Sequence, residues 1–211
     1  APQLDDIYLK GYIPKNNNFL FKKYGIRIVS KKYLLVVYHP VVESINSLKK
    51  EFNIFMRFLK KIDLPKIWIS SNNDAGSEII KSEFYKHRDT NDTIFENIPR
   101  HEYLSLLKNT KCIIGNSSSG IIESSSFKVP CINVGRRQND RIKPKNVVSI
   151  NKVTEKNLLY AYKKISSINF KNKIKKIENP YGSGKSSKKI VDILIKTKID
   201  DKLIKKNIKW K

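Results

Sequence analysis

Short apolar segments alternate with longer amphipathic segments along most of this chain, and this alternation is the strongest constraint on its fold. Residues 34–38 and 112–114 are apolar runs typical of buried strands, whereas residues 43–61 carry apolar side chains at helical spacing. Strands that alternate with helices are typical of an α/β protein with a doubly wound parallel sheet. The predicted strands are 34–38, 67–69, 93–95, 112–114, 130–134 and 147–150, and the predicted helices are 43–61, 76–87, 99–109, 119–127, 154–166 and 186–197.

Polar side chains follow four of these predicted strands. His39 comes after strand 34–38, Asn72 after 67–69, Ser117 and Ser118 after 112–114, and Arg137 after 130–134. The carboxyl ends of parallel strands meet at one edge of the sheet, and ligands of such folds bind there. We therefore expect these side chains to line one crevice.

The segment "KCIIGNSSSGIIESSS" at 111–126 combines a strand, a serine-rich turn and a helix start. Serine hydroxyls and backbone N–H groups at a helix N-terminus suit an anion, above all a phosphate. The alternative is a serine-rich helix cap without a ligand. Arg137 adds a permanent charge with forked donors, and His39 can donate a hydrogen bond whether neutral or charged. Together these groups suit a diphosphate.

Glu123 lies on the helix expected to begin at the serines, and the helical rise places it about 9 Å beyond Ser117. A carboxylate at that distance can accept the hydroxyl groups of a ribose. The alternative is a glutamate that faces solvent. A second glycine-rich run, "NPYGSGKSS" at 179–187, is not a P-loop, because Asn179 stands where that pattern needs its first glycine.

The net charge of +24 raises the possibility of a nucleic acid or an anionic membrane as partner. Lysine accompanies isoleucine and asparagine in all segments, however, and no nucleic-acid-binding motif is present, so we expect neither partner. Cys112 and Cys131 both lie in apolar runs and are expected to be buried thiols of a cytoplasmic protein. Their spacing suggests no metal site, and we expect no cofactor.

Five motifs occur in one order along the chain: "VVYHPV" at 36–41, "NDAGS" at 73–77, "GNSSSGIIE" at 115–123, "VPCINVGRRQNDR" at 129–141 and "NPYGSGK" at 179–185. Together they resemble the UDP-N-acetylglucosamine 2-epimerase family, and its hydrolysing branch in particular. The resemblance implies two Rossmann-like domains in the glycosyltransferase-B arrangement, of which this chain is the C-terminal half. It implies a connecting segment over 1–30 that follows an N-terminal domain absent here, a UDP-binding domain over 31–197 and a basic tail or helix over 198–211.

The resemblance also implies which residues contact the UDP-sugar, namely His39, Asn72, Ile98, Ser117, Ser118, Glu123 and Arg137. The two serines would hold the diphosphate, and Glu123 the ribose hydroxyls. Asn72 and the backbone near Ile98 would lie by the nucleoside. His39 and Arg137 would be the catalytic groups, because they stabilise the charge on the leaving diphosphate.

The implied reaction converts UDP-N-acetylglucosamine and water into N-acetylmannosamine and UDP, as in sialic-acid-type sugar synthesis. Its acid and base groups would come largely from the N-terminal domain, and the protein would be a homo-oligomer. Asn73, Ser71 and Asp140 depart from the family's usual residues. They leave open a related epimerase acting on a diacetamido UDP-sugar, a glycosyltransferase of the same architecture, and a basic nucleic-acid-binding module.

Overall fold

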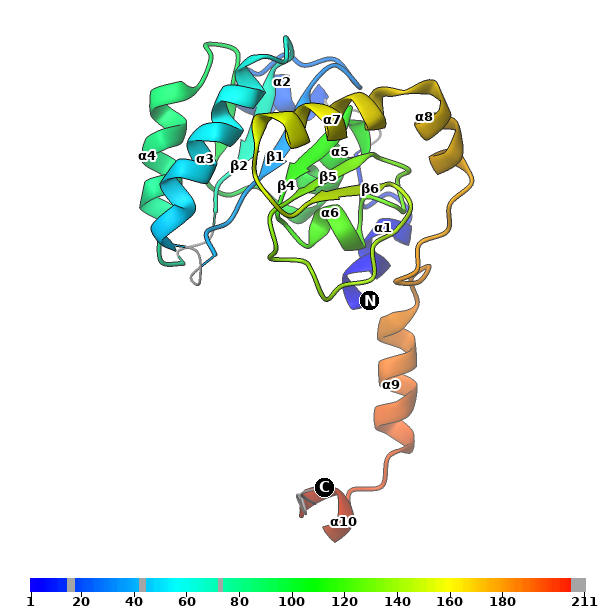
Figure 1. Cartoon of the computed structure of the whole chain (residues 1–211). Coiled ribbons are helices and arrows are strands. Elements are labelled where there is room, and N and C mark those ends of the chain that lie inside the picture. Colours follow the sequence, from blue (N-terminus) through cyan, green and yellow to red (C-terminus); the bar gives the residue numbers. More distant parts are fainter. Residues whose placement is uncertain (15–17, 42–44, 72–73, 206–211) are drawn as a thin grey trace.

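The computed structural model describes residues 1–14, 18–41, 45–71 and 74–205, and in this part of the chain six strands form one parallel sheet (Figure 1). The strands lie in the order β3-β2-β1-β4-β5-β6, which confirms the doubly wound α/β fold. Each strand ends within one residue of its predicted position. The strands are β1 (Leu34–Val37), β2 (Lys66–Ile69), β3 (Thr93–Phe95), β4 (Cys112–Gly115), β5 (Cys131–Val134) and β6 (Val147–Ile150).

Ten α-helices and one short 3-10 helix occur in the described residues. They are η1 (Pro2–Leu4), α1 (Asp5–Tyr8), α2 (Asn18–Tyr24), α3 (Ile45–Lys60), α4 (Ser77–His87), α5 (Arg100–Asn109), α6 (Ser119–Ile122), α7 (Glu155–Ser166), α8 (Ile168–Lys175), α9 (Ser186–Lys196) and α10 (Asp201–Ile204). Four of the six predicted helices are confirmed to within one residue at each end. The helix predicted over 43–61 is confirmed as α3, and its first two residues lie outside the described ranges.

The sheet is covered on both faces, which explains why its strands are apolar throughout. Leu34 and Val36 of β1 belong to an apolar cluster that also contains buried residues of α3, α4 and α7. Leu35 and Val37 point the other way, into a cluster shared with α2 and α5. Figure 1 shows α3, α4 and α7 together in front of the strands, on the opposite side from α2 and α5.

The helix predicted over 119–127 is wrong in its length, because α6 ends at Ile122 and residues 123–128 form turns. The Ser124 hydroxyl donates to the carbonyl of Gly120 at 2.7 Å, and Lys128 has a left-handed φ of +56°. Serine side chains that compete for backbone groups shorten helices in this way. Helix α8 was not predicted; it begins where the Ser167 hydroxyl accepts a bond from the Phe170 amide at 3.2 Å.

An aromatic cluster fixes the chain just before the predicted site residue His39. The Tyr38 ring lies 5.3 Å from Phe52 and 5.2 Å from Phe55 of α3, centroid to centroid. Its burial raises the pKa of the Tyr38 hydroxyl well above the ordinary value. Close aromatic packing of this kind holds the end of β1 in one position.

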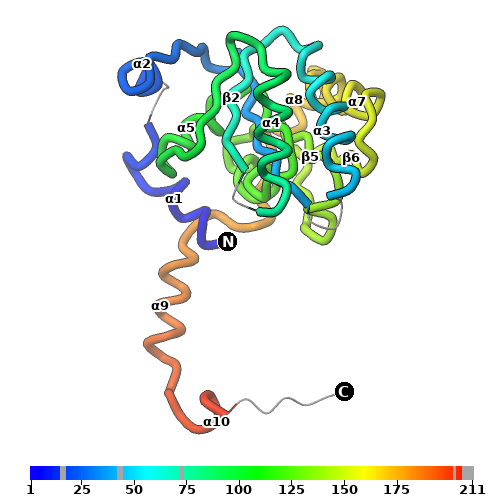
Figure 2. Tube along the Cα trace, turned by 90° about the vertical axis from the view of Figure 1, so that its left-hand side faces the viewer, coloured from blue at the N-terminus to red at the C-terminus, as the bar shows by residue number. Residues whose placement is uncertain are grey.

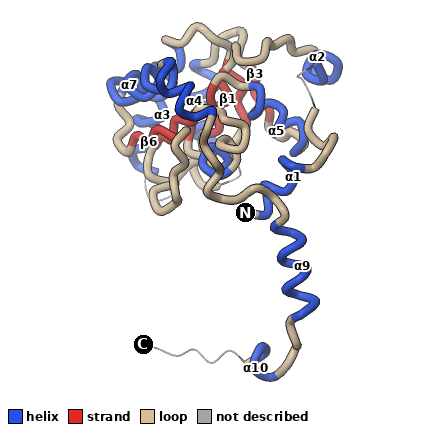
Figure 3. The backbone as a smooth tube through the Cα atoms, turned by 90° about the vertical axis from the view of Figure 1, so that its right-hand side faces the viewer, coloured by secondary structure: helices blue, strands red, loops and turns tan. Residues whose placement is uncertain are grey.

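Helix α9 leaves the sheet domain beside the N-terminal segment. Figures 2 and 3 show it extending away from the domain, with the N-terminus near its base. The Asp5 carboxylate accepts bonds from the Ser186 amide at 2.9 Å, the Ser187 amide at 2.7 Å and the Ser187 hydroxyl at 2.6 Å. These bonds, above all the one from the Ser187 hydroxyl, lower the pKa of Asp5 from 3.8 to about 2. A carboxylate in this position caps the helix and complements its dipole.

The substitution Asp5→Asn should lower the melting temperature at neutral pH, because the charged cap is lost. The pKa of Asp5 is lower in the folded state, so its charge contributes stability above pH 3.8 and this contribution disappears as the pH falls towards 2. Melting curves by circular dichroism at pH 7, 4 and 2.5 should therefore show a difference between wild type and variant that shrinks on acidification. The control Asp201→Asn removes a carboxylate on the exposed helix α10 and should show no such trend; a constant difference for Asp5→Asn would contradict this role.

Candidate functional site

The carboxyl end of β4 lies unusually close to β1 at the centre of the sheet. Gly115 has φ +142°, and a Cβ atom there would overlap the carbonyl oxygen of Val37 and lie 2.6 Å from its carbonyl carbon. The sequence therefore needs glycine at this point. Because the chain crosses to opposite faces of the sheet after β1 and β4, the loops that follow these two strands diverge here, as at the ligand-binding edge of other doubly wound sheets.

Asn116, directly after β4, connects the loops that follow three strands. Its side-chain oxygen accepts a bond from the His39 amide at 2.7 Å, and its side-chain nitrogen donates to the His39 carbonyl at 2.8 Å. Its own carbonyl accepts a bond from Gln138 Nε2 at 2.9 Å and from Arg137 Nη1 at 3.4 Å. The structure thus brings His39 and Arg137 to the same residue, although they lie almost one hundred positions apart in the sequence.

The serine-rich turn follows immediately, and Ser117, Ser118 and Ser119 are all partly exposed. The Ser117 hydroxyl accepts a bond from the Ser119 amide at 3.3 Å, and the Ser119 hydroxyl bonds to the hydroxyl of Tyr103 on α5. Ser118 is the N-cap residue of α6, and its carbonyl accepts bonds from the amides of Ile121 and Ile122. The turn therefore presents hydroxyl groups at the start of a helix, as the sequence predicts.

Glu123 is buried, with 3% of its surface exposed, so it is not the solvent-facing glutamate of the alternative interpretation. Its Oε1 lies 2.8 Å from Nη2 of Arg100, while no described residue donates to Oε2. Arg100 also donates to the Gln3 carbonyl at 2.9 Å and pairs with Asp6 at 3.2 Å. Burial lowers the pKa of Arg100, but the pairs with Glu123 and Asp6 outweigh it and raise the pKa above the ordinary value. The unpaired Oε2 is available to a donor from a ligand.

Two cavities open at this edge of the sheet. One, of about 420 Å³, lies over the ends of β1 and β2, and its lining includes Ile98, Arg100, Tyr103, Ser117 and Ser119. The other, of about 460 Å³, lies over β1, β5 and β6, and its lining includes Tyr38, Glu51, Asn116, Arg136 and Lys152. The loops around Asn116 separate the two cavities.

The predicted site residues are distributed around these two cavities. Ile98 and Ser117 line the 420 Å³ cavity, and Glu123 lies behind the lining residue Arg100. His39 and Arg137 meet at Asn116, which lines the 460 Å³ cavity. Asn72 lies outside the described residues, and so does Asn73.

Four residues near these cavities were not predicted: Arg100, Tyr103, Asn116 and Gln138. Asn116 stands within the motif "GNSSSG", and Gln138 follows Arg137, so the sequence places both near the site without showing what they bond to. Arg100 and Tyr103 are three residues apart on α5 and share one helix face. Asp140, a departure from the family pattern, is exposed, while the buried Gln138 anchors its loop.

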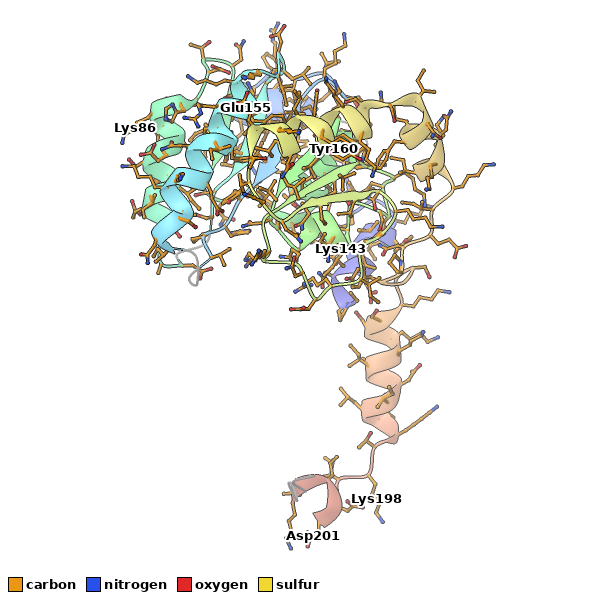
Figure 4. All side chains as sticks on the ribbon, viewed as in Figure 1. Lys86, Lys143, Glu155, Tyr160, Lys198 and Asp201 are labelled. Atoms are coloured by element: carbon orange, nitrogen blue, oxygen red, sulfur yellow. The ribbon has the colours of Figure 1, made fainter. Side chains whose placement is uncertain are left out.

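Other site types find little support in the described ranges. No group of three or more His, Cys, Asp or Glu side chains there is arranged to hold a metal ion, and no helix there is long and apolar enough to cross a membrane. Lys86 on α4, Lys143 between β5 and β6, and Lys198 beyond α9 lie on widely separated parts of the molecule (Figure 4). The basic charge is thus spread over several surfaces.

A parallel sheet in this order, with cavities at its central carboxyl edge, defines a Rossmann-like α/β domain of the glycosyltransferase-B type. The sequence model of the UDP-N-acetylglucosamine 2-epimerase family matches residues 2–195, so the chain belongs to this family. It is 34% identical over 195 residues to a hydrolysing UDP-N,N'-diacetylbacillosamine 2-epimerase of Legionella pneumophila, covering 92% of this chain and 50% of the relative. The chain spans about half the length of the curated relatives it matches.

Two further comparisons agree with this assignment. A hydrolysing GDP/UDP-N,N'-diacetylbacillosamine 2-epimerase of Campylobacter jejuni is 35% identical over 176 residues, which cover 77% of this chain and 44% of the relative. The structure of the UDP-GlcNAc 2-epimerase of Neisseria meningitidis bound to UDP-GlcNAc superimposes with a TM-score of 0.69 at 16% identity, covering 92% of this chain and 52% of that one. The last comparison shows that the folds agree.

The contact between Gly115 and Val37 can be tested by substitution. Gly115→Ala should lower the free energy of unfolding by more than about 3 kcal/mol, because a Cβ atom would collide with backbone. Gly135→Ala is the matched control: Gly135 has φ +79° and nothing within 4 Å of a Cβ, so the cost should be about 1–2 kcal/mol. Urea denaturation measures both, and equal losses would show that the close approach is not the constraint.

Proposed function

We propose that this chain is the UDP-binding half of a hydrolysing 2-epimerase that acts on a UDP-linked 2-acetamido sugar. The observation that carries the proposal is the grouping of the serine-rich turn, Ile98 and the Arg100–Glu123 pair around one cavity at the centre of the sheet edge. UDP-N-acetylglucosamine is the first candidate substrate. A diacetamido UDP-sugar is the second, favoured by the names of the two curated relatives at 34% and 35% identity.

Each part of UDP has a candidate partner. Ser117 and Ser118 hold the diphosphate by donating hydrogen bonds from the turn. Glu123 accepts the ribose hydroxyls with Oε2, which has no donor among the described residues, while Arg100 holds Oε1. Because only 3% of Glu123 is exposed, the ribose reaches it after a small movement of the Arg100 side chain. The backbone at Ile98 lies by the nucleoside, and we assign Asn72 to the same part of the ligand.

The reaction breaks the bond between C1 of the sugar and the diphosphate oxygen, and UDP leaves with the electron pair. Loss of the C2 proton to a base gives a glycal. Water then adds its hydroxyl to C1 while an acid returns a proton to C2 on the opposite face, which yields the C2-inverted free sugar. Arg137, His39 and the serines stabilise the negative charge that grows on the leaving diphosphate.

The acid and base of this reaction are assigned to the preceding half of the protein. Of the residues that line the 420 Å³ cavity, Glu96 carries the carboxylate, and its Oε1 is 2.7 Å from Nζ of Lys81. The hydrogen bond from Lys81 lowers the pKa of Glu96, which makes it a weaker base. The half-length match to the relatives is consistent with a second domain that supplies the missing groups.

We also propose that the preceding half packs against α9. No residue of α9 is buried, and its exposed apolar side chains include Ile190, Ile193 and Leu194, the last 67% exposed. The base of α9 is bonded to Asp5, so a domain that precedes residue 1 would emerge beside this helix. The two buried free thiols, Cys112 and Cys131, are consistent with a cytoplasmic protein.

The chain should bind UDP weakly and should not turn over UDP-sugars alone. Calorimetry should show that Ser118→Ala and Arg137→Ala each weaken UDP about tenfold, as expected for lost hydrogen bonds to a charged group. Arg88→Ala removes the same charge at the far end of α4 and should leave affinity within about twofold at moderate salt. A folded wild-type chain that does not bind UDP at millimolar concentration contradicts the proposal.

Turnover is tested with the chain joined to its preceding half. Separate incubations with UDP-N-acetylglucosamine and UDP-N,N'-diacetylbacillosamine in deuterated water should give UDP and a free sugar with deuterium at C2 from one of them. The faster substrate identifies the sugar. Transfer of the sugar to an added acceptor, without inversion at C2, would instead indicate a glycosyltransferase.

The α9 interface can be mapped by crosslinking in the protein that contains both halves. A photoreactive phenylalanine derivative at position 194 should crosslink to the preceding half, because this face is apolar and uncovered. The same group at Tyr160, an exposed position on α7, is the control and should give no such product. Crosslinked dimers of the whole protein would show that a second copy covers α9 instead.

A further inference from the structure

Asn116 has the most complete set of bonds among the polar residues around the candidate site. It is 1% exposed, and its amide donates to the Val37 carbonyl at 3.1 Å. Its side chain then bonds to both the amide and the carbonyl of His39. The side chain thus acts as an additional peptide group, and it extends the pairing of β1 with β4 beyond the last paired residues, Val37 and Gly115.

The carbonyl of Asn116 makes the connection to the third loop. Gln138, only 2% exposed, donates to it at 2.9 Å, and Arg137 donates to it at 3.4 Å. The loops after β1, β4 and β5 carry His39, the serine turn and Arg137 respectively. One residue therefore holds the three loops that we assign to the diphosphate.

The residue type matters because a carboxamide is both donor and acceptor. Aspartate would lose the donor to the His39 carbonyl, and leucine, of nearly the same shape, would lose both bonds. Loss of the side chain's bonds would leave the partly buried amide and carbonyl of His39 without this partner, which costs free energy and releases the loop.

We propose that Asn116 is a positioning residue for the diphosphate: it sets the relative positions of His39, the serine turn and Arg137 through its bonds to the loops. This inference rests on the proposed function, because it takes UDP to be the ligand. It predicts that loss of the Asn116 side chain weakens binding of the diphosphate part of UDP and spares the nucleoside part. The nucleoside is assigned to the cavity that Ile98 lines, on the other side of these loops.

The test compares two buried asparagines in the same domain. Asn146 is fully buried, and its side-chain nitrogen donates to Ser124 Oγ at 2.7 Å and to the Val129 carbonyl at 2.6 Å, away from the three loops. NMR titration of Asn116→Leu with UDP and with uridine should show about a tenfold loss for UDP and less than about a twofold change for uridine. Asn146→Leu should lower stability but leave the affinity for both ligands unchanged in the folded protein.

Gln138→Met provides a second variant in case Asn116→Leu does not fold. It removes one bond to the Asn116 carbonyl without a change of charge, and should weaken UDP about threefold with uridine again spared. Equal losses for UDP and uridine in these variants, or the same losses in Asn146→Leu, would overturn the positioning role.

Hydrogen exchange without ligand separates this inference from the proposed function. Asn116→Leu should speed exchange of the His39 amide and of amides in the loop of Arg137, whereas Asn146→Leu should not. If the wild-type chain binds no UDP, the proposed function fails and the diphosphate role fails with it. The exchange rates then still show whether Asn116 holds the loops together, and unchanged rates for Asn116→Leu would overturn that as well.

Discussion

The close approach of β4 to β1 is the constraint on which the candidate site depends. Gly115 brings the two backbones together where a side chain would collide with Val37, and this places Asn116 within reach of His39. The serine turn begins at the next residue, so its position follows from the same contact. The strands hold this geometry because both faces of the sheet are covered by helices and are fully apolar.

Electrostatics at the site differ from those of the rest of the molecule. The chain carries a net charge of +24, yet the candidate site contains a buried carboxylate, Glu123, held by Arg100. Burial of an unpaired charge is costly, so the arginine is needed to keep the carboxylate ionised inside the domain. The excess of lysine lies on several surfaces, which keeps copies of the chain apart without defining a binding site.

The sequence predicts the strands and the position of the serine turn well, because both depend on local patterns of apolar, glycine and serine residues. It predicts α6 poorly, since Ser124 competes for a backbone carbonyl, an effect that apolar spacing does not show. It places Glu123 near a ligand but does not reveal Arg100, which comes from another helix. Pairings between distant elements follow from the folded structure, and periodicity carries no information about them.

The N-terminal segment contacts two parts of the molecule through neighbouring carboxylates. Asp5 caps α9, and Asp6 pairs with Arg100, which in turn holds Glu123. These two aspartates lie on the same short helix, so any rotation of that helix displaces the base of α9 and the arginine together. The direction in which α9 extends and the setting of the carboxylate behind the cavity are thus mechanically linked, and a change at either end is felt at the other.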